Sequence, residues 1–196
     1  ATTSALLWEH CQPVFVDIDK NTLNIDPKKI ECAITKKTKA IVAVHVFGNP
    51  CDVDAIEKIA KKHNLKVIYD AAHAFGVKYK GRSILSYGDI SICSFHSTKL
   101  FHTIEGGCLV VKDDKVSGDV ELMKRFGHNS DEHLELGINA KASEFQAAMG
   151  LCNLKYIDDI VAERGRLIKL YDKSLNGKVK KPRLNLRTKY NESYYP

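Results

Sequence analysis

Reactive side chains follow three apolar segments of the sequence, at the point where each segment ends. They are His45, then Asp70 with His73, and then Ser94 with Lys99. An ionised carboxylate that closes an apolar strand is costly to bury alone, so we expect Asp70 to have a cation or a strong hydrogen-bond donor as its partner. A second interpretation, equally good from position alone, is that Asp70 caps the turn that follows it.

Lys99 is the candidate nucleophile of the sequence. It follows an apolar segment and a stretch of small or hydrogen-bonding side chains that includes Ser97 and Thr98. A lysine enclosed in this way can act as a nucleophile toward carbonyl groups. Lysine is also a common surface charge, so a solvated Lys99 is the alternative when only its position is considered.

Several other chemistries lack their sequence motifs. The chain contains no G-x-G-x-x-G, G-x-x-x-x-G-K, G-x-S-x-G or H-E-x-x-H pattern, which argues against dinucleotide, ATP-loop and elbow-serine sites. We expect no metal site, because His96 and His102 have no further ligand at a suitable spacing. The six cysteines form no C-x-x-C pair, so free thiols in a reducing cytoplasm are expected rather than disulfides or zinc.

The elements that must position these side chains alternate between strand and helix. Strands are predicted at 13–18, 40–47, 65–70, 89–95 and 107–111, and helices start at Asp26-Pro27 and at Asp52. This order predicts an α/β fold with a mostly parallel sheet and helices on both faces. Ligands of such sheets bind at the carboxyl ends of the strands. Beyond the sheet, residues 142–175 predict one long helix or two abutting helices, with breaks at Gly150 and Gly165.

Composition limits the possible partners. The chain has 196 residues, of which 44% are hydrophobic, so a sizeable core is expected. No apolar run is long enough to span a bilayer, and no membrane partner is expected. The net charge of +6 comes from scattered lysine pairs; it permits an anionic substrate. Basic residues are not interleaved with aromatic ones, so nucleic acid is not expected either.

Three blocks carry a resemblance to a known family. They are Tyr69-Asp70-Ala71-Ala72-His73-Ala74-Phe75-Gly76, Ser94-Phe95-His96-Ser97-Thr98-Lys99 and Glu105-Gly106-Gly107. With 13–19, 45–48 and 137–148, they make the sequence resemble the DegT/DnrJ-type sugar aminotransferases over about residues 1–171. The resemblance implies the large domain of a fold-type I pyridoxal-phosphate enzyme at 1–175 and the start of a small C-terminal domain at 176–196. It also implies a chain truncated at both ends, without the family's Gly-Thr phosphate loop.

The same resemblance implies roles for individual residues. Lys99 matches the lysine that binds pyridoxal 5'-phosphate covalently, and Asp70 matches the carboxylate that faces the pyridine nitrogen. His73 stands where a Gln or His contacts the phenolic oxygen of the cofactor, and Ser94 where a hydroxyl binds its phosphate. Asn139 matches a residue that reaches the phosphate of the neighbouring subunit, so a homodimer is implied.

The implied function is a cytoplasmic transaminase that moves an amino group from an amino acid, expected to be glutamate, to a nucleotide-linked keto sugar. The product would serve the biosynthesis of amino sugars and polysaccharides. The run from Lys99 to Ile104 resembles a subgroup that uses 4-keto-6-deoxy sugars, although Ile104 stands where the family often has Gly. Two alternatives stay open: a non-catalytic homologue that binds a nucleotide sugar, and a pyridoxal-phosphate-dependent sugar dehydratase. Lys99 argues against the second, because dehydratases of the family replace this lysine with His.

Overall fold

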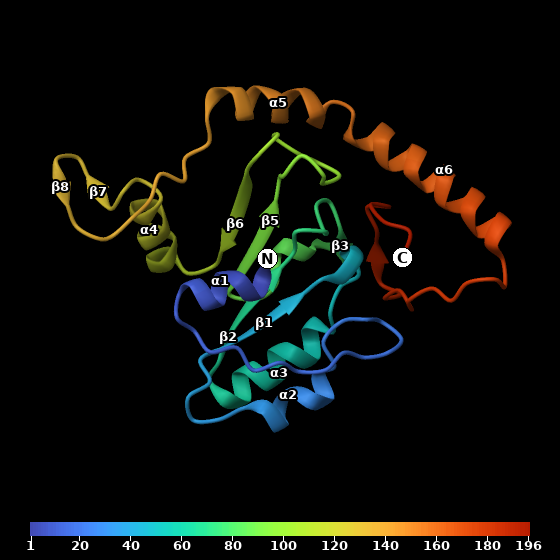
Figure 1. The fold of residues 1–196 in the computed structure, drawn as a ribbon, viewed down its shortest axis with the longest axis horizontal. Helices are drawn as coiled ribbons and strands as arrows, with labels where there is room; N and C mark the ends of the chain where they lie inside the picture. The colour runs from blue at the N-terminus through green and yellow to red at the C-terminus, as the bar shows by residue number, and fades with distance from the viewer.

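The computed structural model describes residues 1–196, built around a four-stranded sheet (Figure 1). Its strands lie in the order β1 (Ala40–Val44), β2 (Lys66–Asp70), β5 (Ile90–Ser94) and β6 (Gly107–Val111). The first three are parallel, and β6 runs antiparallel to β5. This arrangement confirms the predicted α/β fold with a mostly parallel sheet.

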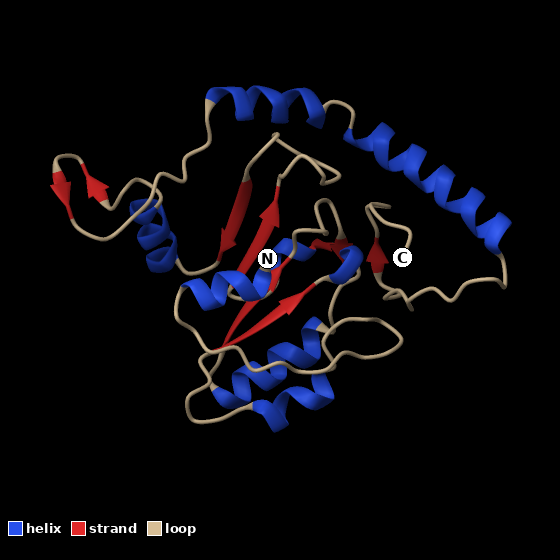
Figure 2. Cartoon of the chain, in the orientation of Figure 1, coloured by secondary structure: helices blue, strands red, loops and turns tan.

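Six helices accompany the sheet (Figure 2). They are α1 (Thr2–Trp8), α2 (Pro27–Ala33), α3 (Val53–His63), α4 (Asp114–Met123), α5 (Glu144–Leu154) and α6 (Ile157–Leu175). Both predicted helix starts are confirmed, because Asp26 accepts a hydrogen bond from the Lys28 N–H and Asp52 from the Ala55 N–H. Each cap satisfies a backbone donor that has no partner within its helix.

Short elements complete the chain. The two-residue strands are β3 (Lys78–Tyr79), β4 (Arg82–Ser83), β7 (His128–Asn129), β8 (Glu132–His133) and β9 (Thr188–Lys189), and the short 3-10 turns are η1 (Val46–Gly48) and η2 (Ile84–Ser86). All six cysteines are free; Cys51 and Cys93 are buried, whereas Cys11, Cys32 and Cys152 are exposed. None of the helices combines the length and the apolar character needed to cross a bilayer.

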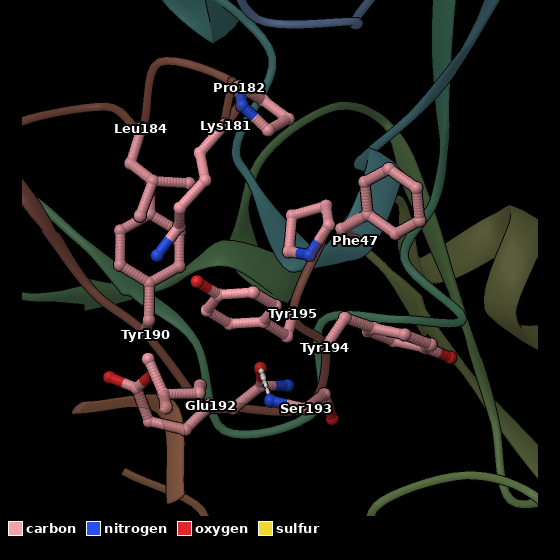
Figure 3. A pocket seen from close by; sticks show the side chains of 12 residues that line it. Phe47, Lys181, Pro182, Leu184, Tyr190, Glu192, Ser193, Tyr194 and Tyr195 are labelled. Carbon is pink, nitrogen blue, oxygen red and sulfur yellow. Dashed lines mark hydrogen bonds between the residues drawn. The ribbon is translucent and has the colours of Figure 1, made fainter. Parts of the chain in front are cut away.

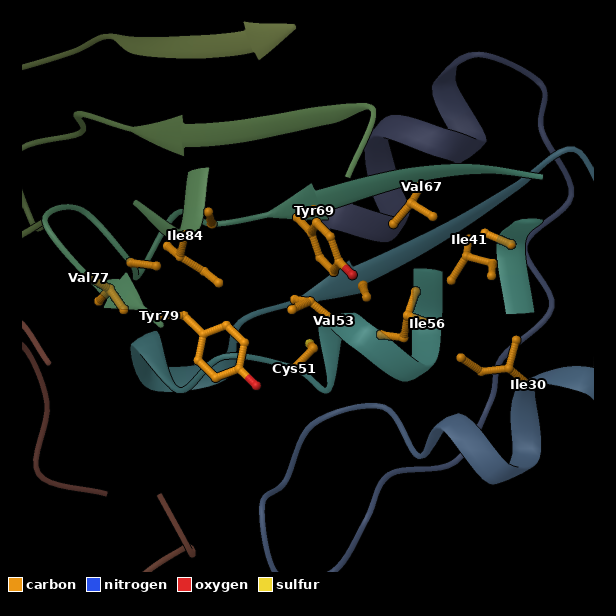
Figure 4. Packing of buried hydrophobic residues seen from close by; sticks show 14 residues of the cluster. Ile30, Ile41, Cys51, Val53, Ile56, Val67, Tyr69, Val77, Tyr79 and Ile84 are labelled. Carbon is orange, nitrogen blue, oxygen red and sulfur yellow. The ribbon is translucent and has the colours of Figure 1, made fainter. Parts of the chain in front are cut away.

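The hydrophobic core lies between the sheet and helices α2 and α3 (Figure 4). Val67 and Tyr69 point from β2 toward Ile56 of α3, which is fully buried, and Ile30 of α2 closes the cluster. Alternate residues of a strand face opposite sides of a sheet, which is why residues 67 and 69 enter this core and Asp70 does not. The core therefore fixes the strand ends from which the candidate site is built.

We expect Ile56→Ala to lower the free energy of unfolding by about 2–5 kcal/mol, because it leaves a cavity in a fully buried position. Urea unfolding followed by circular dichroism measures this loss. Leu186→Ala is the matched control: Leu186 is 99% exposed, so its truncation should change stability by no more than about 0.5 kcal/mol. Equal effects of the two substitutions would contradict the assigned core.

The predicted strand at 13–18 is wrong. Residues 13–17 are in no strand, and Ile18 forms only an isolated bridge with Ile25. Val14 and Phe15 are 65% and 78% exposed. The segment has the β-branched and aromatic residues of a strand, but propensity alone makes no strand where no neighbouring strand pairs with the backbone.

The predicted helical region does divide in two, but not at its glycines. The break between α5 and α6 falls at Lys155 and Tyr156, whereas Gly150 and Gly165 lie inside the helices. Gly150 has a packing role: a Cβ at this position would lie 3.0 Å from Cγ2 of Thr103. The missing side chain therefore lets α5 approach the loop that follows β5.

The C-terminal segment packs against the body of the chain. Strand β9 pairs antiparallel with β3, and the buried Asn191 side chain donates hydrogen bonds to the carbonyl oxygens of His73 and Phe75 at 3.0 and 2.8 Å. Residues 188–191 thus brace the turn that follows β2. The domain boundary after residue 175 stays a prediction.

Candidate active site

The candidate site forms at the carboxyl ends of β1, β2 and β5. In the parallel register Val44 is paired with Asp70, and Asp70 with Ile92. The His45 N–H donates to the carbonyl oxygen of Asp70 at 3.0 Å. The predicted groups that begin at His45, Asp70 and Ser94 are therefore brought to one edge of the sheet, as the parallel order requires.

Both carboxylate oxygens of Asp70 are hydrogen-bonded. Oδ1 accepts from the Ala72 N–H at 3.0 Å, and Oδ2 accepts from the Thr2 hydroxyl at 2.5 Å. The expected strong donor is present as this hydroxyl, and no lysine or arginine forms an ion pair with Asp70. The bond to Ala72 shows that Asp70 also caps the turn after β2, so the two interpretations of Asp70 are compatible.

His73 lies on that turn with its tautomer fixed. Its Nδ1 accepts from the Phe47 N–H at 3.3 Å, so in the neutral ring Nε2 carries the hydrogen. Partial burial lowers the pKa of His73, the nearby charge of Lys99 lowers it further, and the charge of Asp70 opposes both. The charges of Lys99 and Asp70 thus act on the pKa of His73 in opposite directions.

Ser94 and Lys99 belong to the end of β5 and the loop that follows. Ser94 Oγ accepts from the His96 N–H at 3.3 Å, and the Lys99 N–H donates to the carbonyl oxygen of His96 at 2.9 Å. Lys99 is half-buried, and its amine forms no hydrogen bond or ion pair in the structure. The amine is thus available to react.

Three phenylalanines join this loop to the turn that carries His73. Phe101 stacks on Phe75 with ring centroids 4.4 Å apart, and it meets the edge of Phe95 at 5.0 Å. Phe101 is only 5% exposed. This phenylalanine cluster fixes the position of the Lys99 loop relative to the turn after Asp70.

Asn139 lies apart from these residues. It is exposed and forms an isolated bridge with Arg125, beyond the hairpin of β7 and β8. Figure 1 shows this arm away from the ends of β2 and β5. Within one chain, the structure does not bring Asn139 to Lys99.

His45 is fully buried beside the site. Its ring stacks on Tyr69 with centroids 4.6 Å apart, and Nδ1 accepts from the Cys51 N–H at 3.0 Å. Nε2 is buried and has no hydrogen-bond partner. Burial lowers the pKa of His45 to about 3, which the charge of Asp70 opposes. The ring is therefore neutral and structural near pH 7.

The buried His45 should make the protein sensitive to acid. Its pKa is about 3 when folded against an ordinary value of 6.5, so between these values the unfolded chain binds a proton that the folded chain does not. The free energy of unfolding should fall with decreasing pH in this window, by up to about 1.4 kcal/mol per pH unit from this group. Urea unfolding at pH 7, 5.5 and 4 measures the slope. His45→Asn should reduce the slope and the exposed control His10→Asn should not; an unchanged slope in His45→Asn would contradict the assignment.

An aromatic pocket adjoins the site (Figure 3). It is lined by Phe47, Tyr190, Tyr194, Tyr195 and Lys181, among others. Tyr194 also contacts the His73 ring, with centroids 4.6 Å apart. Neither Tyr194 nor Thr2 can be identified from the sequence as a site residue, because nothing in the local sequence shows that residues so far from 70–73 fold onto them.

Known proteins resemble the chain along nearly its whole length. A model of the DegT/DnrJ/EryC1/StrS aminotransferase family matches residues 1–195. The dTDP-4-amino-4,6-dideoxy-D-glucose transaminase of Shigella dysenteriae is 49% identical over 168 residues, which are 85% of this chain and 45% of that protein. The GDP-perosamine synthase of Caulobacter vibrioides is 36% identical over 192 residues, which are 95% of this chain and 52% of that protein.

The fold has solved counterparts. The crystal structure of DesI in the presence of its TDP-sugar product superimposes with a TM-score of 0.85 at 38% identity, over 90% of this chain and 45% of DesI. The chain thus spans about half the length of the relatives that it matches.

Proposed function

Because the chain belongs to the DegT/DnrJ/EryC1/StrS aminotransferase family, we propose that it carries the cofactor-binding part of a pyridoxal-phosphate-dependent transaminase that acts on nucleotide-linked keto sugars. The observation that carries the proposal is the parallel register of β2 and β5, which brings Asp70 with its following turn and Ser94 with the Lys99 loop to one edge of the sheet. A lysine amine and a carboxylate are the groups that pyridoxal-phosphate enzymes use to bind the cofactor and to pair with its ring nitrogen.

The residues fit the cofactor by the chemistry of their functional groups. Lys99 would hold the cofactor covalently through its free amine, and the Asp70 carboxylate would hold the protonated ring nitrogen. Ser94 would bind the phosphate through its hydroxyl. His73 has Nδ1 occupied by the Phe47 N–H, so its Nε2–H would donate to the phenolic oxygen.

Lys99 would move the proton during amino transfer. Bound pyridoxal phosphate supplies an electron sink for the carbon next to the amino group. Lys99 Nζ would accept the proton from that carbon and return it as general base and general acid. The negative charge of Asp70 favours this chemistry, because it stabilises positive charge on the ring nitrogen.

The substrate class rests on the relatives. The proteins that the chain resembles are named for a dTDP-linked 4-amino-4,6-dideoxy sugar and for a GDP-linked amino sugar, and DesI was solved with a TDP-sugar. We propose a 4-keto-6-deoxy sugar nucleotide as acceptor and glutamate as donor, for amino-sugar and polysaccharide biosynthesis. The exposed Asn139 would reach the site of a second copy in a homodimer. The cytoplasmic location stays a prediction.

Absorbance spectroscopy tests the proposal. The purified protein should gain a visible band with pyridoxal phosphate, lose it when glutamate is added, and recover it with a 4-keto-6-deoxy sugar nucleotide. Mass spectrometry should show the amino sugar product. A protein that stays colourless would overturn the proposal in favour of a non-catalytic module that binds nucleotide sugars. A band that no amino acid bleaches would point to a reaction other than amino transfer.

A further inference from the structure

The shorter of the two hydrogen bonds to the Asp70 carboxylate comes from a residue 68 positions away. Thr2 Oγ1 donates to Asp70 Oδ2 at 2.5 Å, and both residues are half-buried. A hydroxyl that donates to an ionised carboxylate at this distance forms a charge-assisted bond, which is about twice as strong as a neutral one. The contact is therefore one of the stronger polar interactions at the candidate site.

This bond does not serve the hydrophobic core. Helix α1, which begins at Thr2, buries none of its residues, and its neighbour Thr3 forms no side-chain hydrogen bond. The side-chain hydrogen bond of Thr2 connects α1 to the carboxyl end of β2. What the bond does fix is the orientation of the Asp70 carboxylate.

Two donors hold that carboxylate at two points. The Ala72 N–H occupies Oδ1 and the Thr2 hydroxyl occupies Oδ2. An ionised carboxylate offers about four lone-pair directions, so acceptor capacity remains for a third group. The β-branched Thr2 has few side-chain rotamers to lose, which suits it to hold a fixed direction. The Asp70 carboxylate is thus held in one orientation, and no lysine or arginine forms an ion pair with it.

We infer that Thr2 is a positioning residue that orients the Asp70 carboxylate for the positively charged ring nitrogen of the cofactor. The inference rests on the proposed function. The candidate site then includes Thr2 at the start of α1, which acts on the cofactor through Asp70. Without the Thr2 bond, the carboxylate could rotate about its side-chain torsions and would meet the ring nitrogen in fewer of its orientations.

Matched variants test this role. Thr2→Val keeps the shape of the side chain but removes the donor, Thr2→Ser keeps the donor, and Thr3→Val makes the same change one residue away. We expect Thr2→Val to weaken pyridoxal phosphate binding about 10-fold, as the loss of a hydrogen bond to a charged group predicts. Absorbance titration measures this dissociation constant. Thr2→Ser and Thr3→Val should stay within about 2-fold of the wild type and should keep its thermal midpoint.

A double variant shows whether Thr2 acts through Asp70. In an Asp70→Asn background, Thr2→Val should have little further effect on cofactor affinity, because residues in one hydrogen-bond network are not additive. Additive losses would overturn the inference, and so would a Thr2→Val variant that binds the cofactor as the wild type does. A wild type without a visible band would overturn the proposed function itself, and this inference with it. The two failures are therefore distinguishable.

Discussion

Lys99→Arg is expected to reduce kcat for amino transfer by about 10⁴-fold, the upper range for losing a general acid–base residue. Arginine keeps the positive charge of Lys99, but its guanidinium stays protonated and can neither attack a carbonyl nor accept a proton. The visible band should disappear with the activity. Because the Lys99 amine forms no hydrogen bond or ion pair, the fold should tolerate the exchange.

Stopped-flow absorbance with glutamate measures the loss, and Lys37→Arg is the control for a lysine-to-arginine exchange on the surface. The control should retain the wild-type rate. An Lys99→Arg variant that keeps more than a few per cent of wild-type kcat would remove Lys99 from its assigned role, whatever its effect on cofactor affinity.

Asp70→Asn should reduce kcat by about 10²- to 10³-fold, comparable to the loss of one preorganised electrostatic group in other enzymes. Asparagine can still accept the hydrogen bond from the Ala72 N–H, so the turn after β2 should keep its geometry. The substitution removes the negative charge that favours a protonated ring nitrogen. Steady-state kinetics should therefore show a large fall in kcat with a smaller change in KM for glutamate.

The control for Asp70→Asn is Asp119→Asn. Asp119 is exposed on α4 and its side chain forms no hydrogen bond or ion pair, so this variant carries the same change in net charge away from the carboxyl ends of β1, β2 and β5. If both variants lost kcat equally, the effect would come from net charge. If KM alone rose in Asp70→Asn, the carboxylate would contribute to binding and not to the chemical step.

The central strands could be predicted because their signal is local. Residues 40–44, 66–70 and 90–94 are short apolar runs, and each forms a strand of the sheet. The parallel order then placed Asp70 and Ser94 at one edge. The segment 13–18 is also rich in β-branched residues, yet it forms no strand, because strand formation depends on which backbone lies beside a segment in space.

The contacts that define the side-chain positions could not be predicted. The Thr2 hydroxyl reaches Asp70, the Phe47 N–H reaches His73, and Asn191 holds the turn from 116 to 118 residues away. No pattern of residue spacing in the sequence indicates these contacts, because each one depends on how loops far apart in the chain pack together. The resemblance identifies Lys99 and Asp70 as catalytic residues and adds His73, Ser94 and Asn139 as residues that bind the cofactor; these roles remain predictions.

The phenylalanine cluster restricts the motion of the candidate site before a ligand binds. Phe101 is packed against both Phe75 and Phe95, so the segment that bears the amine and the segment that bears the carboxylate cannot shift independently. Binding to a mobile site would cost the conformational entropy of its side chains and loops. Here this entropy is already lost when this part of the chain folds. Calorimetry should accordingly find a smaller entropic penalty of association than for a variant in which Phe101 is truncated to alanine.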